Sequence, residues 1–294
     1  MIVPGYTKMD ASTPAERKNL AVVERLYDEV FNKRDVSAAD SLMSSELLQH
    51  NPLYGEGLSG FKGYLDGFCF EQFPDLRVRI DVAVAQNSRV MAFTTWTGRH
   101  AASGAELSLP VADVYRLYEG RLVEHWDMTD YTALEQFGVV RPGITQPADP
   151  LDKFGTPVQL MNLGRLRQYL DDVTIADLSR AHLYVAEDFV QHTPDVDPGL
   201  AGFKACFEAF TPFAPDLEVV STCILAGTHH VGAIWTGYGH NPHTGDKFIL
   251  PTADIYRMDY GMLTEHWGLV DYTYPRQMLG FHPKEMLRMM TPAG

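Results

Sequence analysis

An internal repeat constrains this chain more than any other feature. The 19 residues at positions 109–127 (LPVADVYRLYEGRLVEHWD) recur at positions 250–268 as LPTADIYRMDYGMLTEHWG, with 11 identities. Gln49-His50-Asn51-Pro52 recurs 142 residues later as Gln191-His192-Thr193-Pro194. A period of about 140 residues is too long for a solenoid repeat and matches the size of an ordinary domain. The sequence therefore predicts two tandem copies of one unit.

Composition predicts where the two copies join. Residues 141–156 (RPGITQPADPLDKFGT) are rich in proline and glycine and show little apolar periodicity, which is typical of a linker. We therefore expect one domain over residues 1–140 and a second over residues 157–294, joined by residues 141–156.

Each copy is expected to begin with helices and to continue as an antiparallel sheet. Ser12-Thr13-Pro14-Ala15-Glu16 combines a helix cap, a first-turn proline and an early acid, and apolar residues follow at helical spacing. Further helices are predicted at 36–43 and 58–73, and strands at 76–85, 90–98, 107–118 and 122–128. The fold class is α+β: a curved antiparallel sheet covered by N-terminal helices, forming a cone-shaped barrel with an apolar pocket.

Charge and composition narrow the range of partners. The formal net charge of −14 disfavours nucleic acid and anionic membrane surfaces. No apolar run reaches the roughly 18 residues that a membrane span needs. We find no secretion signal, and the three cysteines lack C-x-x-C spacing, which favours buried thiols in a reducing cytoplasm. The expected partner is a small molecule.

The last two predicted strands carry the polar residues that do not suit a strand core. Alternation places His125 and Asp127 on one face and Trp126 on the other, and Asp113 stands on the preceding strand. A three-residue hairpin turn would set Asp113 opposite His125 or Asp127, so that all three share a face. A strict two-residue turn would set it opposite Trp126. The sequence leaves both registers open.

If the three side chains share the concave face, they can perform acid–base chemistry. Burial and like-charge proximity raise the pKa of one carboxyl group while the other stays ionised. The alternative is structural, with Asp127 ending a strand and His125 bonded locally. Recurrence of Asp113 and His125 as Asp254 and His266 favours function only in part, because a pair that maintains the fold would also be copied.

Other histidines offer weaker candidates. His50 lies in a turn-forming Gln-His-Asn-Pro motif and either enters the pocket or caps the turn. His229, His230, His240 and His243 cluster in the second copy but form no compact ligand set with a nearby acid. We therefore predict no metal, and no cofactor, since a phosphate loop and a dinucleotide fingerprint are also missing.

These motifs resemble the SnoaL-like polyketide cyclase family of the NTF2-like superfamily, which also contains ketosteroid isomerase, scytalone dehydratase and limonene epoxide hydrolase. The resemblance covers each copy nearly end to end and rests on Gln49-His50-Asn51-Pro52, Asp113-Val114-Tyr115-Arg116 and Glu124-His125-Trp126-Asp127. It implies a cone-shaped barrel, acid–base chemistry without a cofactor, and Asp127 as the acid/base. Asp113 matches the position of a second pocket residue of the cyclases. That residue is histidine in the cyclases, so the resemblance does not assign a role to Asp113.

The second copy departs from this pattern, because Asp127 aligns with Gly268. Its remaining pocket candidates are His192, Asp254, His266 and Asp271. Either this copy has lost activity and serves as a built-in partner, which we favour, or it works with Asp254 and His266. Family members usually dimerise through the outer sheet face, so the resemblance implies a covalent pseudo-dimer and leaves further homo-oligomerisation open.

The leading hypothesis is a cofactor-independent isomerase, lyase or cyclase. Its substrate would be a small, largely apolar carbonyl or hydroxyl compound, of aromatic or polyketide type. Asp127 would transfer the proton, Asp113 and His125 would orient or polarise, and His50 would hold a substrate oxygen. The rival hypothesis is a non-catalytic module for small-molecule binding or assembly, and a less favoured one is a water-activating hydrolase.

Overall fold

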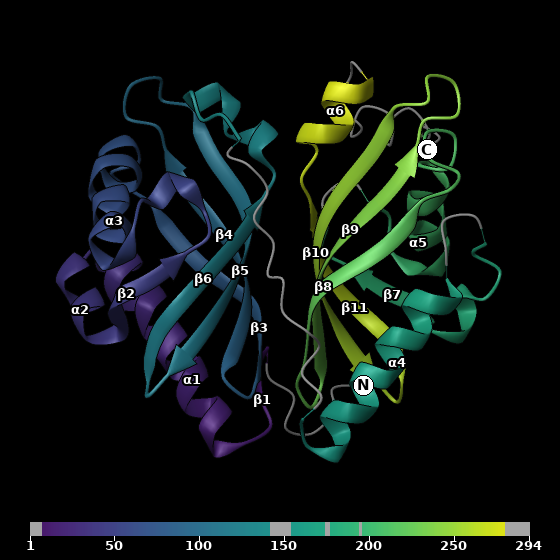
Figure 1. Ribbon diagram of the computed structural model, residues 1–294, viewed down its shortest axis with the longest axis horizontal. Helices are drawn as coiled ribbons and strands as arrows, with labels where there is room; N and C mark the ends of the chain where they lie inside the picture. The colour runs from purple at the N-terminus through teal and green to yellow at the C-terminus, as the bar shows by residue number, and fades with distance from the viewer. Residues whose placement is uncertain (1–7, 142–153, 174–176, 194–195, 280–294) are drawn as a thin grey trace. The chain divides into compact units, whose positions relative to one another are not determined.

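The described residues form two compact units. The computed structural model describes residues 8–141, 154–173, 177–193 and 196–279. Residues 8–141 with 154–156 belong to the first unit, and the described residues from 157 onwards belong to the second (Figure 1). The predicted linker lies largely outside the described residues.

A capping box fixes the start of the first helix. The Thr13 hydroxyl accepts a hydrogen bond from the Glu16 backbone N–H (3.2 Å), and the Glu16 carboxylate accepts one from the Thr13 N–H (2.8 Å). Two N–H groups that the helix itself cannot satisfy are thereby paired. Helix α1 runs over Pro14–Arg25 and continues as a π-helical segment over Leu26–Asn32, which confirms the predicted helix start.

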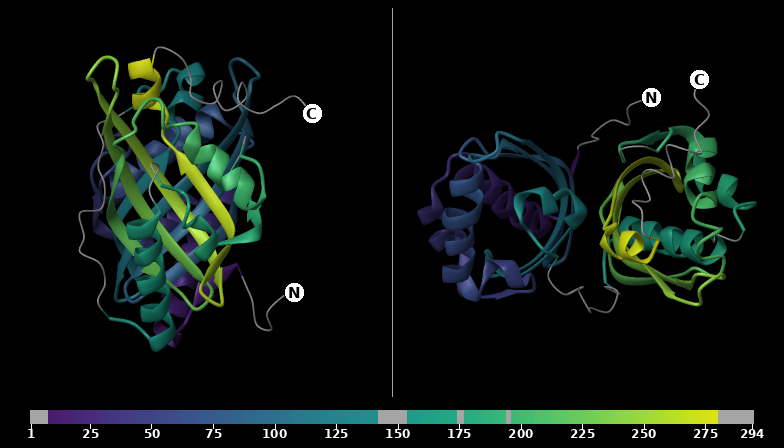
Figure 2. Two further views of the ribbon diagram at one scale, coloured as in Figure 1. Left: turned by 90° about the vertical axis from the view of Figure 1, so that its right-hand side faces the viewer. Right: turned by 90° about the horizontal axis from the view of Figure 1, so that it is seen from above.

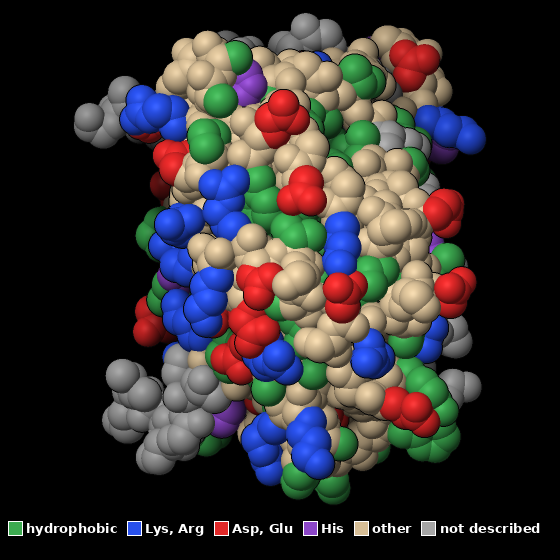
Figure 3. Space-filling model, turned by 90° about the vertical axis from the view of Figure 1, so that its left-hand side faces the viewer, with side chains coloured by type: hydrophobic (Ala, Val, Ile, Leu, Met, Phe, Trp, Pro, Cys, Tyr) green, Lys and Arg blue, Asp and Glu red, His purple; other side chains and the backbone are tan. Residues whose placement is uncertain are grey.

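The other helical elements of the first domain are short. They are helices α2 (Ala39–Leu42) and α3 (Gly57–Tyr64), the π-helical extension Leu65–Phe70, and the 3-10 turns Val36–Ala38, Pro52–Tyr54, Tyr131–Ala133 and Glu135–Phe137. Charged side chains of both signs are interspersed on the outer face of this domain, as a solvated face requires (Figure 3).

The first sheet has six strands in the order β1-β3-β4-β5-β6-β2. Its four central strands are antiparallel and match the prediction: β3 (Arg77–Gln86), β4 (Arg89–Arg99), β5 (Glu106–Tyr118) and β6 (Arg121–Thr129). The two edge strands, β1 (Met9–Ala11) and β2 (Met43–Gln49), pair in parallel with β3 and β6. The sequence did not predict these edge strands.

The second domain repeats this plan, which confirms the tandem repeat. Its sheet has the order β7-β11-β10-β9-β8, with β7 parallel to β11. Its elements are α4 (Pro157–Asp172), the 3-10 turn Ala181–Leu183, β7 (Val185–Gln191), α5 (Gly199–Glu208), β8 (Glu218–Ala226), β9 (His230–His240), β10 (Lys247–Asp259), β11 (Met262–Val270) and α6 (Thr273–Leu279).

In each domain the sheet curves around helices packed against one of its faces (Figure 2). Buried side chains of α1, such as Val23, join buried residues of the sheet, such as Ala83 and Ala92, in one apolar core. The fold class is α+β, as predicted, but the sheets are curved and open rather than closed barrels, since each strand order ends at two distinct edge strands. Within the described residues, no helix is both long and apolar enough to cross a membrane.

Candidate active site

The hairpin between β5 and β6 turns on two residues. Glu119 and Gly120 both have positive φ (49° and 75°), and Tyr118 pairs with Arg121 across them. Positive φ at both central residues is the geometry of the tight turn that suits twisted antiparallel strands. Carried on without interruption, this register would keep Asp113 away from the polar residues of β6.

A β-bulge corrects that register. Val123 is inserted as an extra residue in β6, and the pairing shifts by one position. As a result Asp113 pairs with Asp127, and Tyr115 pairs with His125. From the sequence, a two-residue turn was expected to separate Asp113 from His125 and Asp127. The structure has the two-residue turn, and the bulge nevertheless brings the three side chains to one face.

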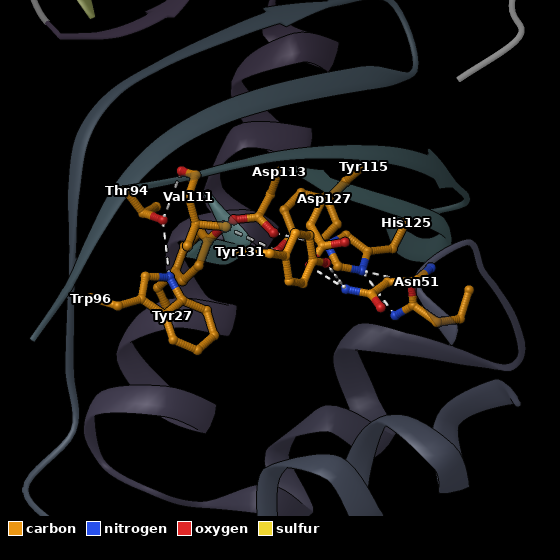
Figure 4. Close-up of polar contacts among 11 residues, drawn as sticks. Tyr27, Asn51, Thr94, Trp96, Val111, Asp113, Tyr115, His125, Asp127 and Tyr131 are labelled. Carbon is orange, nitrogen blue, oxygen red and sulfur yellow. Dashed lines mark hydrogen bonds and ion pairs between the residues drawn. The ribbon is translucent and has the colours of Figure 1, made fainter. Parts of the chain in front are cut away.

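Asp113 of β5 and His125 of β6 form a buried pair on one face of the sheet (Figure 4). Each is 2% exposed, and His125 Nε2 lies 2.9 Å from Asp113 Oδ1. The Tyr27 hydroxyl donates to Asp113 Oδ2 at 2.6 Å and lies 3.1 Å from the Tyr115 hydroxyl. The Gln49 amide contacts His125 Nδ1, with its Nε2 at 2.9 Å. Both carboxylate oxygens and both ring nitrogens are therefore engaged within the protein.

Asp127 is instead held at the cavity surface. Its Oδ2 accepts a hydrogen bond from Asn51 Nδ2 at 2.9 Å, and the same amide lies 3.1 Å from the Tyr131 hydroxyl. Asp127 is half-buried, whereas Asn51 is 5% exposed. The carboxylate thus has one positioned donor (Figure 4), and Asp127 also lines a cavity of the first domain.

The first cavity is open to solvent, has about 510 Å³ of empty space when that opening is included, and is mainly apolar and aromatic. Its lining residues are Asn51, Leu53, Tyr54, Tyr64, Phe68, Cys69, Phe73, Leu76, Trp96, Leu107, Leu109, Val111, Asp127, Thr129, Tyr131 and Leu134. Asp127 is the one carboxylate among these described lining residues.

Burial tunes the ionisable groups of this site. Burial, aided by the charge of Asp113, raises the pKa of Asp127 to about 6, while His125 and the Asn51 hydrogen bond oppose the shift. Burial also raises the pKa of the Tyr54 hydroxyl well above its usual value, with the charge of Asp127 adding to the effect. Asp127 can therefore exchange a proton near neutral pH, and Tyr54 remains a hydrogen-bond donor.

His50 lies apart from the cavity, contrary to the prediction that it holds a substrate oxygen. Its ring stacks on Trp126 with a centroid distance of 4.5 Å, and its Nε2 lies 2.9 Å from Glu124 Oε1. Both partners stand on the face of β6 opposite to His125, and His50 continues β2 on that same outer face. Alternation within Gln49-His50-Asn51 sends the two amides inward and the histidine outward.

The second domain holds a related pair with different surroundings. His266 Nε2 lies 2.7 Å from Asp254 Oδ1, and His266 Nδ1 lies 2.9 Å from Gln191 Oε1. The second carboxylate oxygen of Asp254 accepts a hydrogen bond from the Trp235 indole. Asp254 pairs with Gly268 across the hairpin, where the first domain has Asp127.

Two other residues predicted for the second pocket lie elsewhere. His192 stacks on Trp267 at a centroid distance of 4.7 Å and contacts Glu265, as His50 does in the first domain. Asp271 is 1% exposed and accepts the Thr273 backbone N–H at 3.0 Å, at the start of α6. Neither lines the second cavity, because one faces outward and the other supports the chain after β11.

Sequence reasoning missed three residues of the first site. Asn51 was assigned to turn chemistry, although its side chain also positions Asp127. Gln49 was noted only as part of the repeat and of the family motif, and Tyr54 was not considered. The available signal was the alternation after β2, which places Gln49 and Asn51 on the face that His125 shares. Among the described residues, no group of three or more His, Cys, Asp or Glu side chains could hold a metal ion.

Two protein-family models match the chain, one in each domain. The family model described as SnoaL-like polyketide cyclase matches residues 21–136, and the model described as SnoaL-like domain matches residues 166–266. The chain is a tandem of two SnoaL-like domains. The matched segments contain both hairpin pairs, Asp113 with His125 and Asp254 with His266. A search of curated proteins finds no match.

Several solved structures are similar to one SnoaL-like domain. A protein assigned as a SnoaL-like polyketide cyclase from Jannaschia sp. CCS1 has 23% identity and a TM-score of 0.40, covering 43% of this chain and 94% of its own. TsrD from Streptomyces laurentii has 22% identity and a TM-score of 0.38, covering 41% and 93%. IdmH from Streptomyces antibioticus, assigned as a polyketide cyclase, has 23% identity and a TM-score of 0.37, covering 41% and 99%.

Proposed function

We propose that the first domain is a cofactor-independent acid–base enzyme acting as an isomerase, lyase or cyclase. Its substrate would be a small, largely apolar carbonyl or hydroxyl compound, of aromatic or polyketide type. Membership of the SnoaL-like family suggests activity of this general kind. The observation that carries the proposal is Asp127, a carboxylate with a raised pKa that faces an apolar cavity.

The proposed step is removal of a proton from a carbon next to a carbonyl group. The Asp127 carboxylate takes the proton, and the electrons of the broken C–H bond move into an enolate. Asn51 keeps the carboxylate oriented throughout. A base whose pKa lies near the working pH is effective in both directions, since it must also return the proton.

Tyr54 is our candidate for holding the substrate oxygen, in place of His50. Its hydroxyl group stays protonated, and the residue lines the same cavity as Asp127. A hydrogen bond from a buried phenol strengthens as negative charge develops on the oxygen. The buried pair of Asp113 and His125 would act on Asp127 through its charge, since neither residue lines the cavity.

Two features favour the enzymatic reading over a module that only binds. A purely binding role would be favoured by a pocket filled with its own aromatic side chains, or by a register that turns Asp113 outward. In the described residues a cavity remains open beside Asp127, and Asp113 faces inward. A hydrolase would require Asp127 to activate water rather than a carbon acid.

The test measures how fast the protons next to the carbonyl group of an apolar ketone exchange for deuterium from the solvent. 2-Tetralone is suitable because it is aromatic and has acidic protons beside its carbonyl group. The full chain in D₂O should accelerate deuterium incorporation, measured by NMR, and Asp127→Asn should reduce the rate by about 10²–10⁴. Asp66→Asn, at an exposed position, is the matched control and should leave the rate unchanged. Equal rates for the Asp127 variant and the unmodified chain would reject the role of Asp127.

The remaining assignments stay proposals about the whole chain. They are the domain limits at residues 140 and 157, the pseudo-dimer, further homo-oligomerisation and a cytoplasmic location.

A further inference from the structure

The second cavity is larger than the first. At three positions where a larger residue lines the first cavity, a smaller residue lines the second. Tyr54, Tyr64 and Asp127 correspond in the repeat to Val196, Cys206 and Gly268. With the openings to solvent included, the second cavity has about 670 Å³ of empty space and the first about 510 Å³.

These replacements expose the histidine–aspartate pair. In the first domain Tyr54 covers His125 edge-on, with ring centroids 5.6 Å apart, and the pair does not line the cavity. In the second domain both Asp254 and His266 line the cavity. The lining aromatic side chains around them are Phe203, Phe207, Phe210, Trp235, Tyr256 and Tyr272.

Gly268 is required for this arrangement. A Cβ atom at this position would lie 2.5 Å from His266 Cε1, 2.6 Å from His266 Nε2 and 2.7 Å from Asp254 Oδ1. Such contacts are too short for any residue larger than glycine unless the pair moves. The missing carboxylate and the exposed pair are therefore two aspects of one change.

The hydrogen bonds of His266 determine which polar groups Asp254 and His266 present to the second cavity. Gln191 Oε1 accepts the backbone N–H of Thr193 at 3.0 Å, which orients this amide so that its oxygen faces His266 Nδ1. The other ring nitrogen faces the Asp254 carboxylate. Both ring nitrogens thus face oxygen atoms within the protein, while a carboxylate oxygen can accept more than one hydrogen bond. Beside Gly268 the cavity therefore offers Asp254 Oδ1 as an acceptor.

We propose that the second cavity is a separate ligand site, which binds a largely apolar molecule through one hydroxyl group seated over Gly268. A phenol or enol hydroxyl can donate to Asp254 Oδ1 beside the contact that this oxygen makes with His266 Nε2. An ether or an unsubstituted hydrocarbon lacks this donor and would cover the cavity side of the carboxylate oxygen without a hydrogen bond, which is costly in an apolar site. This site does not depend on the function proposed for the first domain.

The test compares two probes of similar shape on the full chain. 2-Naphthol carries the hydroxyl group, and 2-methoxynaphthalene replaces it with an ether. Calorimetry gives the affinities, and hydrogen exchange read by mass spectrometry locates the site. We expect 2-naphthol to protect residues 247–270 and to bind there at least tenfold more tightly than the ether.

Two variants separate this site from general apolar binding. Gly268→Ala should weaken 2-naphthol binding in the second domain at least tenfold, whereas Gly164→Ala should not, because a Cβ at Gly164 meets nothing within 4 Å. Asp254→Leu has a side chain of similar size but removes the acceptor of the hydroxyl proton, and it should remove the preference for the hydroxyl probe while circular dichroism stays unchanged. Protection confined to the first domain, equal affinity for the two probes, or full binding by Gly268→Ala would each overturn the proposal.

Discussion

The raised pKa of Asp127 predicts that this residue lowers the stability of its own domain at neutral pH. In an unfolded chain its carboxyl group ionises near pH 3.8, but in the folded domain it ionises at about 6. Ionisation is therefore harder in the folded state. Asp127→Asn removes the charge, and its side-chain oxygen can still accept the hydrogen bond from Asn51.

The size and sign of the effect follow from these two values. The difference of about 2 pKa units corresponds to about 3 kcal/mol, and solvent access through the cavity should reduce it to about 1–3 kcal/mol. Below about pH 4 both states are protonated and the variant gains nothing. The advantage of Asp127→Asn then grows as the pH rises from about 4 to about 6, and above that it is constant.

The assay must follow the two domains separately. Urea-dependent oxidation of buried methionines by hydrogen peroxide, read by mass spectrometry, does so. Met91 is 0% exposed and reports the first domain, whereas Met258 is 4% exposed and reports the second. In Asp127→Asn the Met91 transition should move to higher urea at pH 7 but not at pH 4, and the Met258 transition should stay in place.

Two outcomes would refute this reasoning. One is a shift of the Met91 transition that is the same at pH 4 and pH 7. The other is a variant less stable than the unmodified chain at pH 7. Asp66→Asn removes an exposed carboxylate and should show no such pH dependence.

Three further predictions concern the first site. The rate of deuterium exchange should rise with pH through about 6, because the carboxylate of Asp127 is the reactive form, and a pH–rate profile of Asp127→Asn should lack this limb. Tyr54→Phe should lower kcat about tenfold or more with little change in KM, since the lost hydrogen bond strengthens only as the enolate forms; steady-state kinetics distinguish this from a loss of binding. Deletion of Val123 should remove the bulge while Asp113 stays opposite Asp127, because the deleted residue is the unpaired one, so deuterium exchange into the substrate should be retained; loss of that exchange in a variant whose β5 and β6 amides stay protected would contradict the pairing.

Much of the fold follows from local sequence. The capping box at Thr13 and Glu16 and the β-branched and aromatic runs of β3 to β6 act through near neighbours, so their periodicity predicts them. Strand β2 does not behave in this way. It follows α2 directly and becomes a strand because it pairs with β6, more than 70 residues away in the chain. Local propensity carries no information about such a partner.

The candidate site was predictable only in part, for a similar reason. Alternation correctly placed His125 and Asp127 on one face, but the meeting with Asp113 depends on a bulge at Val123. No glycine or other special residue marks that bulge in the sequence. The position of His50 away from the cavity was not foreseen because strand β2 was not recognised, and with it the alternation that turns Gln49 and Asn51 inward.

The two domains differ by a coupled set of positions rather than by the loss of one carboxylate. Asp127 is held by Asn51, and Tyr54 covers the histidine beneath it. At the corresponding positions the second domain has Gly268, Thr193 and Val196. Thr193 binds the Gly268 backbone carbonyl at 3.1 Å, and His266 occupies the space that a side chain at 268 would need. An aspartate restored at position 268 would therefore displace His266 and find no amide to hold it. Each cavity is internally consistent, and each arrangement excludes the other in the same domain.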